Sequence, residues 1–272
     1  MTDLQSKNET ASLSSIGDMP ISDFPTVYRF LVKLDYSQTD HIQRVEQALY
    51  QLLKENPDST IGLILLMQEQ IMQGAHQKAL SIAYRIWDLG GDLNPALEAL
   101  YIGNLLNVGL IDMASSLLKA KLENLDEAIP TFLNQIMKYA LMSGNIFLLR
   151  RIVALEQDID KKKILQDFCD IFTYLKAEDT FKALQQSITE MLRDVLLGYE
   201  YTFYTDRGFT DIEISIYVGD EAGDLEALRQ KIEMKITTFC IARKLPRFNN
   251  LNYVIRPITE HPSLVSLSQK AL

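Results

Sequence analysis

Three stretches of the sequence begin with a glycine and continue with helix-forming residues: GAHQKALSIAYRI at 74–86, GLIDMASSLL at 109–118 and GNIFLLRRIV at 144–153. The glycines recur every 35 residues, from 74 to 109 and from 109 to 144. Glycine adopts the left-handed conformation that ends a helix and allows a tight reversal of the chain. A unit of this length holds two helices, which bury their apolar faces against neighbouring units. The interval therefore predicts antiparallel helix hairpins that turn at these three glycines.

The helical pattern extends beyond these stretches, over residues 23–197. Apolar residues recur there at steps of three and four, as in amphipathic helices. Asn94 and Pro95 are the residue types preferred at an N-cap and at the first helical position. Residues 1–22 are rich in Ser, Thr, Asn and Asp and show no apolar period. We expect those residues to form a disordered tail.

The position five residues after each turning glycine is expected to pack between helices. Ala79 and Ala114 occupy it in the first two units, and Leu149 occupies it in the third. A small residue there allows the two helices of a hairpin to approach closely. A fourth unit is predicted to begin near Glu178, which places Ala183 at the corresponding position.

The glycine-to-alanine spacing, the 35-residue period and Pro57 at the end of a second helix resemble the tetratricopeptide-repeat superfamily over residues 24–197. The resemblance implies an α-solenoid of about four hairpins with a protein-binding groove on its inner face. It assigns no binding residue, because the matching positions are packing positions. A hairpin array unrelated by descent to that superfamily is the alternative.

Beyond the helical region the sequence changes from a helical period to a strand period. YEYTFYT at 199–205 and DIEISIYV at 211–218 alternate in polarity, which is typical of half-buried strands. The stretch at 225–245 has helical apolar spacing, and LNYVIRPI at 251–258 is a third strand candidate. We expect residues 198–272 to form a ββαβ α+β domain in which the third strand is parallel to the second and lies beside the first.

One face of this sheet is expected to be covered by its helix and the other to stay open. Tyr204 and Tyr217 fall on the open face, and exposed tyrosines are typical of protein contact surfaces. Arg243, Lys244 and Arg247 cluster at the end of the helix, where basic side chains complement the helix dipole or hold an anion or an acidic partner. These five residues are the predicted protein-binding residues.

The composition excludes several classes of function. The 272 residues carry a formal net charge of −9, which argues against nucleic-acid binding and against an anionic membrane surface. No apolar run approaches the ~18 residues of a membrane helix, and the N-terminus lacks the pattern of a secretory signal. Cys169 and Cys240 are too few for a disulfide framework, so we expect free, buried thiols in a reducing cytoplasm.

No motif with a known chemical mechanism stands out. His41, His76 and His261 lie near turns or the tail without metal-ligand spacing to other residues, and we interpret them as surface polar residues. The stretch GDEAGD at 219–224 lacks the ligand pattern of a calcium loop. We interpret it as a loop in which Asp224 caps the following helix. No catalytic residue, metal ion or cofactor is therefore predicted.

The sequence favours a non-enzymatic, protein-binding adaptor or scaffold in a cytoplasmic assembly. An adaptor or chaperone subunit of a secretion machine is one setting that fits, by analogy from fold to role. A second copy of the chain, bound through the C-terminal domain, is a further candidate partner. The alternative is a regulator that senses a small molecule or nucleotide with its ββαβ domain. An enzyme with an unrecognised site is the third class.

Overall fold

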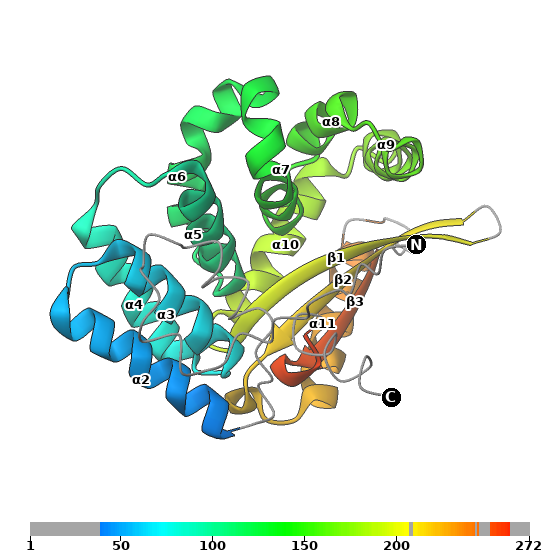
Figure 1. Ribbon diagram of the computed structural model, residues 1–272. Coiled ribbons are helices and arrows are strands. Elements are labelled where there is room, and N and C mark those ends of the chain that lie inside the picture. The colour runs from blue at the N-terminus through cyan, green and yellow to red at the C-terminus, as the bar shows by residue number, and fades with distance from the viewer. Residues whose placement is uncertain (1–38, 207–208, 243, 245–250, 262–272) are drawn as a thin grey trace, which may run out of the picture.

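The computed structural model describes residues 39–206, 209–242, 244 and 251–261, so the expected tail lies outside it. Within these ranges the protein is mostly helical, with a small three-stranded sheet near the C-terminus, as predicted (Figure 1). The helices before the sheet are α2 (Thr39–Glu55), α3 (Thr60–Met72), α4 (His76–Leu89), α5 (Pro95–Asn107), α6 (Ile111–Glu123), α7 (Leu125–Met142), α8 (Ile146–Leu155), α9 (Ile159–Tyr174) and α10 (Glu178–Leu192). The sheet region contains β1 (Leu196–Asp206), β2 (Phe209–Val218), η3 (Asp220–Ala222), α11 (Leu225–Ala242), β3 (Leu251–Pro257) and η4 (Ile258–Glu260).

The glycines of the 35-residue interval follow α3, α5 and α7, as predicted. Their φ angles are 82° at Gly74, 78° at Gly109 and 64° at Gly144. Each glycine N–H donates to the carbonyl three residues before it, and the next N–H donates to the carbonyl five residues before it, over 2.8 to 3.1 Å. These two bonds form a Schellman motif, which satisfies the last carbonyls of the helix. Five residues later, Ala79 and Ala114 are fully buried, which confirms their predicted packing role.

The fourth turn corrects the prediction. It lies at Lys176, and α10 already begins at Glu178. Lys176 has a φ of 50° and closes α9 with the same two backbone hydrogen bonds as the glycines. The third unit is therefore three residues shorter than the others. As a result, Phe181 takes the fully buried position five residues after the turn, and Ala183 is only partly buried.

The predicted helix caps are present. The Asn94 Oδ1 accepts the N–H of Leu97 at 3.0 Å, and Pro95 is the first residue of α5. The Asp224 Oδ1 accepts the N–H of Glu226 at 2.9 Å at the start of α11. Both side chains satisfy an N–H that has no partner within its own helix.

The strands follow the order β1-β2-β3 across the sheet. β1 pairs antiparallel with β2, and β3 pairs parallel with β2. The expectation that the third strand lies beside the first is wrong, because the crossover through α11 brings β3 to the opposite edge of β2. Within the described residues, β1 is therefore an edge strand.

The sheet packs directly on the helices. Figure 1 shows β1 as the strand nearest to α5, α7 and α10, with β3 farthest from them. Leu196 and Leu197, at the start of β1, are at most 1% exposed and belong to the same hydrophobic cluster as the helices. A Cβ built on Gly219, just after β2, would lie 2.9 Å from the carbonyl oxygen of Gly74 in the first turn. The hydrophobic core is thus continuous where the sequence period changes.

Two histidines that the sequence places near turns are buried. His76 and His261 are 1% and 9% exposed, so the interpretation of these histidines as surface residues is wrong. Burial lowers the pKa of His76 below its usual value, and the side chain of His41 lies outside the described residues. A turn position is not a surface position here, because neighbouring elements pack over the hairpin ends.

The two cysteines are free and buried, as predicted. Burial raises the pKa of the Cys169 thiol to about 12, so the reactive thiolate is scarce at neutral pH.

Candidate functional site

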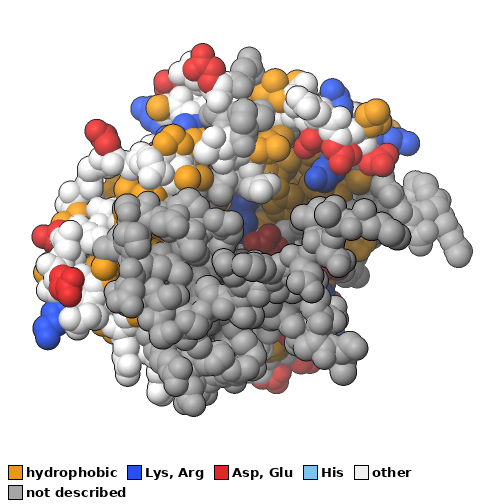
Figure 2. All heavy atoms as spheres, viewed as in Figure 1, with side chains coloured by type: hydrophobic (Ala, Val, Ile, Leu, Met, Phe, Trp, Pro, Cys, Tyr) orange, Lys and Arg blue, Asp and Glu red, His pale blue; other side chains and the backbone are white. Residues whose placement is uncertain are grey.

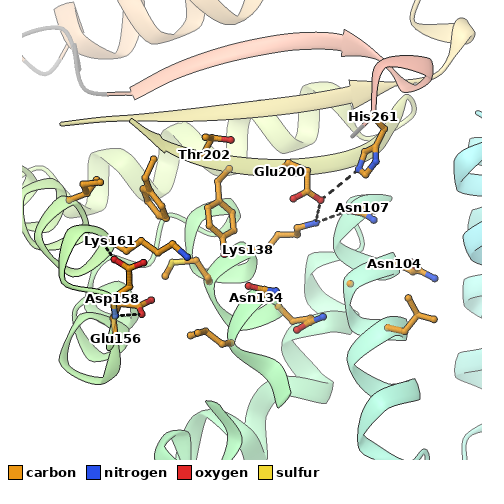
Figure 3. A pocket seen from close by; sticks show the side chains of 18 of the residues that line it. Asn104, Asn107, Asn134, Lys138, Glu156, Asp158, Lys161, Glu200, Thr202 and His261 are labelled. Atoms are coloured by element: carbon orange, nitrogen blue, oxygen red, sulfur yellow. Dashed lines mark hydrogen bonds and ion pairs between the residues drawn. The ribbon is translucent and has the colours of Figure 1, made fainter. Parts of the chain in front are cut away.

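A cavity of about 750 Å³ lies between the helices and β1. Its walls come from α5, α7, the start of α9 and β1, and His261 closes one end (Figure 3). Figure 2 shows a hollow in which hydrophobic, basic and acidic side chains meet. The polar and charged lining residues include Asn104, Asn107, Asn134, Gln135, Lys138, Glu156, Asp158, Asp160, Lys161, Glu200 and Thr202.

Three lining residues are related by the 35-residue interval. Gln68 on α3, Gly103 on α5 and Lys138 on α7 each lie six residues before a turning glycine. Equivalent positions of successive hairpins thus face the cavity. A Cβ built on Gly103 would lie 3.7 Å from the Nε2 of Gln135, an ordinary contact distance, so a side chain could project from this position toward the cavity.

One edge of β1 has no partner strand among the described residues, and this strand also contributes to the cavity wall. The four consecutive residues 200–203 line the cavity. Successive side chains of a strand point to opposite faces of a sheet, so a consecutive run borders a cavity where the strand edge faces it. In the described part of the chain, β1 pairs with β2 alone, along its other edge. This lining strand therefore has backbone N–H and C=O groups that no described strand pairs with.

Lys138, Glu200 and His261 form a charged group at one end of the cavity (Figure 3). The Lys138 Nζ donates to the Oδ1 of Asn107 and to the Oε1 of Glu200, each over 3.0 Å. The His261 Nε2 lies 3.7 Å from the same Glu200 oxygen. Burial alone raises the pKa of Glu200, but His261 and Lys138 outweigh it and hold this pKa at about 2. Glu200 thus stays ionised at neutral pH and connects β1 to α7.

The opposite end of the cavity is acidic. Glu156 and Asp158 precede α9, and Asp160 and Lys161 lie in its first turn. The Asp158 Oδ1 caps α9 by accepting the N–H groups of Asp160 and Lys161 at 3.0 and 3.1 Å. Three carboxylates with one ammonium group leave this end with a net negative charge.

The two walls differ in polarity. Asn104, on α5, is 1% exposed, and neither of its amide atoms has a hydrogen-bond partner among the described residues. A buried amide without partners is costly. On β1, the partly buried rings of Tyr201 and Phe203 lie with their centroids 5.4 Å apart and form an apolar surface.

The two tyrosines predicted for protein binding lie in different environments, and neither lines this cavity. Tyr204 is 48% exposed, in agreement with the prediction. Tyr217 is only 3% exposed, so its prediction as a surface residue is wrong. Its ring packs beside Gly198, its partner across β1 and β2, and lies 4.6 Å from the ring of His261. The missing side chain of Gly198 leaves the space that Tyr217 fills.

The basic residues predicted at the end of α11 are described only in part. Lys244 is exposed, with a φ of 54°, and does not line the cavity. Arg243 and Arg247 lie outside the described residues. The candidate site is thus separate from Lys244.

The charged group of the cavity was not predicted from the sequence, although one signal was present. Lys138 interrupts the apolar run at 136–142 and occupies the equivalent position to two other lining residues. A charge at a repeated position on an apolar helix indicates an inner polar surface. Glu200 and His261 reach Lys138 only through the packing of the sheet, which no sequence spacing predicts.

Comparisons with known proteins give no guide to the site: no protein family, no curated protein and no solved structure matches the chain. Among the described residues, no helix is long and apolar enough to cross a membrane. Within the same ranges, no group of three or more His, Cys, Asp or Glu side chains is placed to hold a metal ion.

Proposed function

We propose that this protein is a non-enzymatic adaptor that binds a segment of another protein in the cavity between α5, α7 and β1. The observation that carries this proposal is that residues 200–203 line the cavity and belong to a strand whose second edge no described strand pairs with. A strand edge offers main-chain hydrogen bonds to an extended segment whatever its side chains. The adjoining rings and charged groups then select among segments.

In this proposal the helices form a repeat scaffold of four hairpins, similar to the tetratricopeptide-repeat superfamily. The four Schellman turns and the equivalent lining positions on α3, α5 and α7 support a repeated unit. Residues 198–261 act as a ββαβ module that closes the groove of the scaffold. The partner thus contacts both parts.

A cytoplasmic assembly remains the proposed setting, with an adaptor or chaperone of a secretion machine as one example. Such proteins hold an exposed segment of a partner until it is assembled. The net charge of −9 and the acidic end of the cavity suit a basic partner segment. A cavity of this charge favours protein over nucleic acid as the bound polymer.

The charged group of the cavity supports a binding role over a catalytic one. Glu200 has a pKa of about 2 because His261 and Lys138 outweigh its burial. A carboxylate with so low a pKa is a weak general base at neutral pH. Its charge instead holds Lys138 and β1 in place.

Site-specific crosslinking tests this proposal. A photoreactive phenylalanine derivative at Asn134, an exposed lining residue, should crosslink a protein partner in cells. The same derivative at Lys231, on the exposed side of α11, is the matched control and should not. Crosslinking at both positions or at neither would contradict the cavity as the site.

A cavity-filling variant provides the second arm of that test. Gly103→Leu places a side chain in a helix interior at the cavity wall, where its Cβ would make only ordinary contacts. It should abolish the crosslink from Asn134 without loss of folding, because glycine is a poor helix former. Gly103→Ala should keep the crosslink and stabilise the protein by about 0.5–1 kcal/mol.

A small-molecule sensor is the second candidate function. It is favoured by the cavity volume of about 750 Å³, which falls within the range of ligand pockets, roughly 300–1,000 Å³. Native mass spectrometry of protein purified from its host distinguishes the two functions. A stoichiometric bound metabolite that Gly103→Leu displaces would favour the sensor.

A further inference from the structure

The cavity also indicates the kind of protein segment that it receives. We propose that the segment is an extended peptide carrying Lys or Arg, and that it binds as an additional strand along residues 200–203, on the edge of β1 that no described strand pairs with. This inference rests on the proposed function, because it describes the chemistry of the segment that the adaptor holds.

The backbone geometry favours strand addition. Residues 200–203 span about 13 Å at 3.3 Å per residue, enough to pair with a short strand. β2 already occupies the other edge of β1, so an added strand lies on the cavity side. Tyr201 and Phe203 share one face of the sheet, and Glu200 and Thr202 share the other. The side chains of an added strand would alternate in the same way.

The charges of the cavity favour a cationic segment over an anionic one. Lys138 is bound to Glu200 over 3.0 Å, so this pair leaves little net charge. The remaining charged lining residues are Glu156, Asp158 and Asp160 on the acidic side and Lys161 on the basic side. The excess of two carboxylates attracts Lys or Arg.

The acidic end and the aromatic surface are neighbours, which suits the two parts of a basic side chain. Burial is the main cause that raises the pKa of Tyr201, and the negative charges of Glu200 and Glu156 raise this pKa further. Glu156 and Tyr201 also line the same cavity. The aliphatic stem of Lys or Arg would lie on the rings of Tyr201 and Phe203, and its charged head would reach the carboxylates.

A peptide library identifies the segment directly. Random dodecapeptides on phage are selected on the full chain, and the enriched peptides are synthesised. We expect enriched sequences with Lys or Arg beside alternating β-branched or aromatic residues. Their binding should weaken as salt increases, because the charged contacts are partly exposed.

Backbone methylation of the selected peptides tests strand addition. Only one edge of an added strand pairs with β1, so N-methylation of one alternate set of residues should weaken binding about tenfold or more. Methylation of the other set should change binding little. Peptide binding should also slow hydrogen exchange at alternate amides among residues 200–203.

Neutralising variants test the charge preference. Glu156→Gln with Asp160→Asn keeps the shape of the acidic end and should weaken the basic peptides about fivefold to tenfold. Asp170→Asn removes a charge from the exposed side of α9, away from the cavity, and is the control. Asp158 is left unchanged because it caps α9.

The outcomes separate this inference from the proposed function. Absence of any enriched peptide, or binding that Gly103→Leu leaves intact, would overturn both. A second outcome is that Gly103→Leu abolishes peptide binding while both sets of methylated peptides still bind. This result would overturn strand addition but would leave the proposed adaptor function standing. Enrichment of acidic peptides, or no effect of the double variant, would overturn the cationic preference alone.

Discussion

The first three hairpin turns and the fourth share one backbone geometry but differ in residue type. The first three turns use glycine, whereas Lys176 takes a φ of 50° with a full side chain. Five residues later the buried position holds alanine twice, then Leu149 and finally Phe181. The difference shows that the packing of the two helices imposes the turn, and that glycine lowers its cost without being required everywhere.

The three glycines are themselves not equivalent. A Cβ on Gly144 would lie 2.5 Å from the Cα of Lys182, whereas a Cβ on Gly109 would lie 3.4 Å from a methyl group of Leu196. A Cβ on Gly74 would lie 3.5 Å from a methyl group of Ile258. Gly144 is therefore required for its φ and for the close approach of α10, while the other two are required mainly for φ.

The largest effect is expected at the buried position of the fourth hairpin. Phe181 is fully buried, with its ring centroid 4.5 Å from that of Phe172 and 5.6 Å from that of Phe168. Phe181→Ala should lower the free energy of unfolding by about 3–5 kcal/mol, measured by urea denaturation. Lys182→Ala, on the exposed side of α10, is the control. A loss below about 1 kcal/mol would show that the fourth hairpin does not pack like the others.

The next effect is expected at the third turn. Gly144→Ala should cost about 3 kcal/mol, because it combines the left-handed conformation with a backbone clash. Gly109→Ala should cost only about 1–2 kcal/mol, since alanine there is strained by the left-handed conformation but does not clash with a neighbouring backbone. Equal losses in thermal or urea unfolding would remove the distinction between the glycines.

A smaller effect is expected from adding volume between the helices of the second hairpin. Ala114 is fully buried, and Ala114→Leu should cost about 1–3 kcal/mol by overpacking. Leu149 occupies the same position in the third hairpin. The loss of stability in Ala114→Leu therefore measures how much closer the two helices of the second hairpin lie than those of the third. Ser116→Leu, on the exposed side of α6, should be nearly neutral. An unchanged denaturation midpoint for Ala114→Leu would contradict close helix approach.

The smallest effect, a gain, is expected at the fourth turn. Lys176→Gly should raise the free energy of unfolding by about 0.5–1 kcal/mol, because glycine adopts positive φ without strain. Lys176→Ala keeps the strained conformation and should give no such gain. Destabilisation by glycine would mean that the lysine side chain makes a contact worth more than the strain.

Sequence reasoning recovered the helices and three turns because their signals are local. Glycine at a fixed interval and apolar residues at helical spacing both act within a few residues. The fourth turn escaped because lysine has no preference for positive φ and the unit there is shorter. β3 was misplaced because the order of strands depends on which edge of β2 is covered, and this is decided by packing.

The candidate site was harder to predict because it joins distant segments. Lys138 and Glu200 are 62 residues apart and meet only when β1 packs on α7. Tyr217 fell on the polar side of the predicted strand, but the absence of a side chain at Gly198 and the position of His261 make that spot a buried one. The spacing of the sequence alone indicated one member of the site, Lys138, which lies at a repeated position on the inner surface of the helices.

The close approach of Gly219 to Gly74 has a consequence for how this architecture can evolve. Arrays of helix hairpins commonly gain or lose whole units, because each unit contacts only its neighbours. Here the end of β2 contacts the first turn, while α11 of the same sheet region contacts α10 of the last hairpin. An inserted hairpin would increase the distance between these two contacts, whereas the strands that join them would keep their length. A relative with one more hairpin than the described residues contain would therefore need longer strands or would lose one contact.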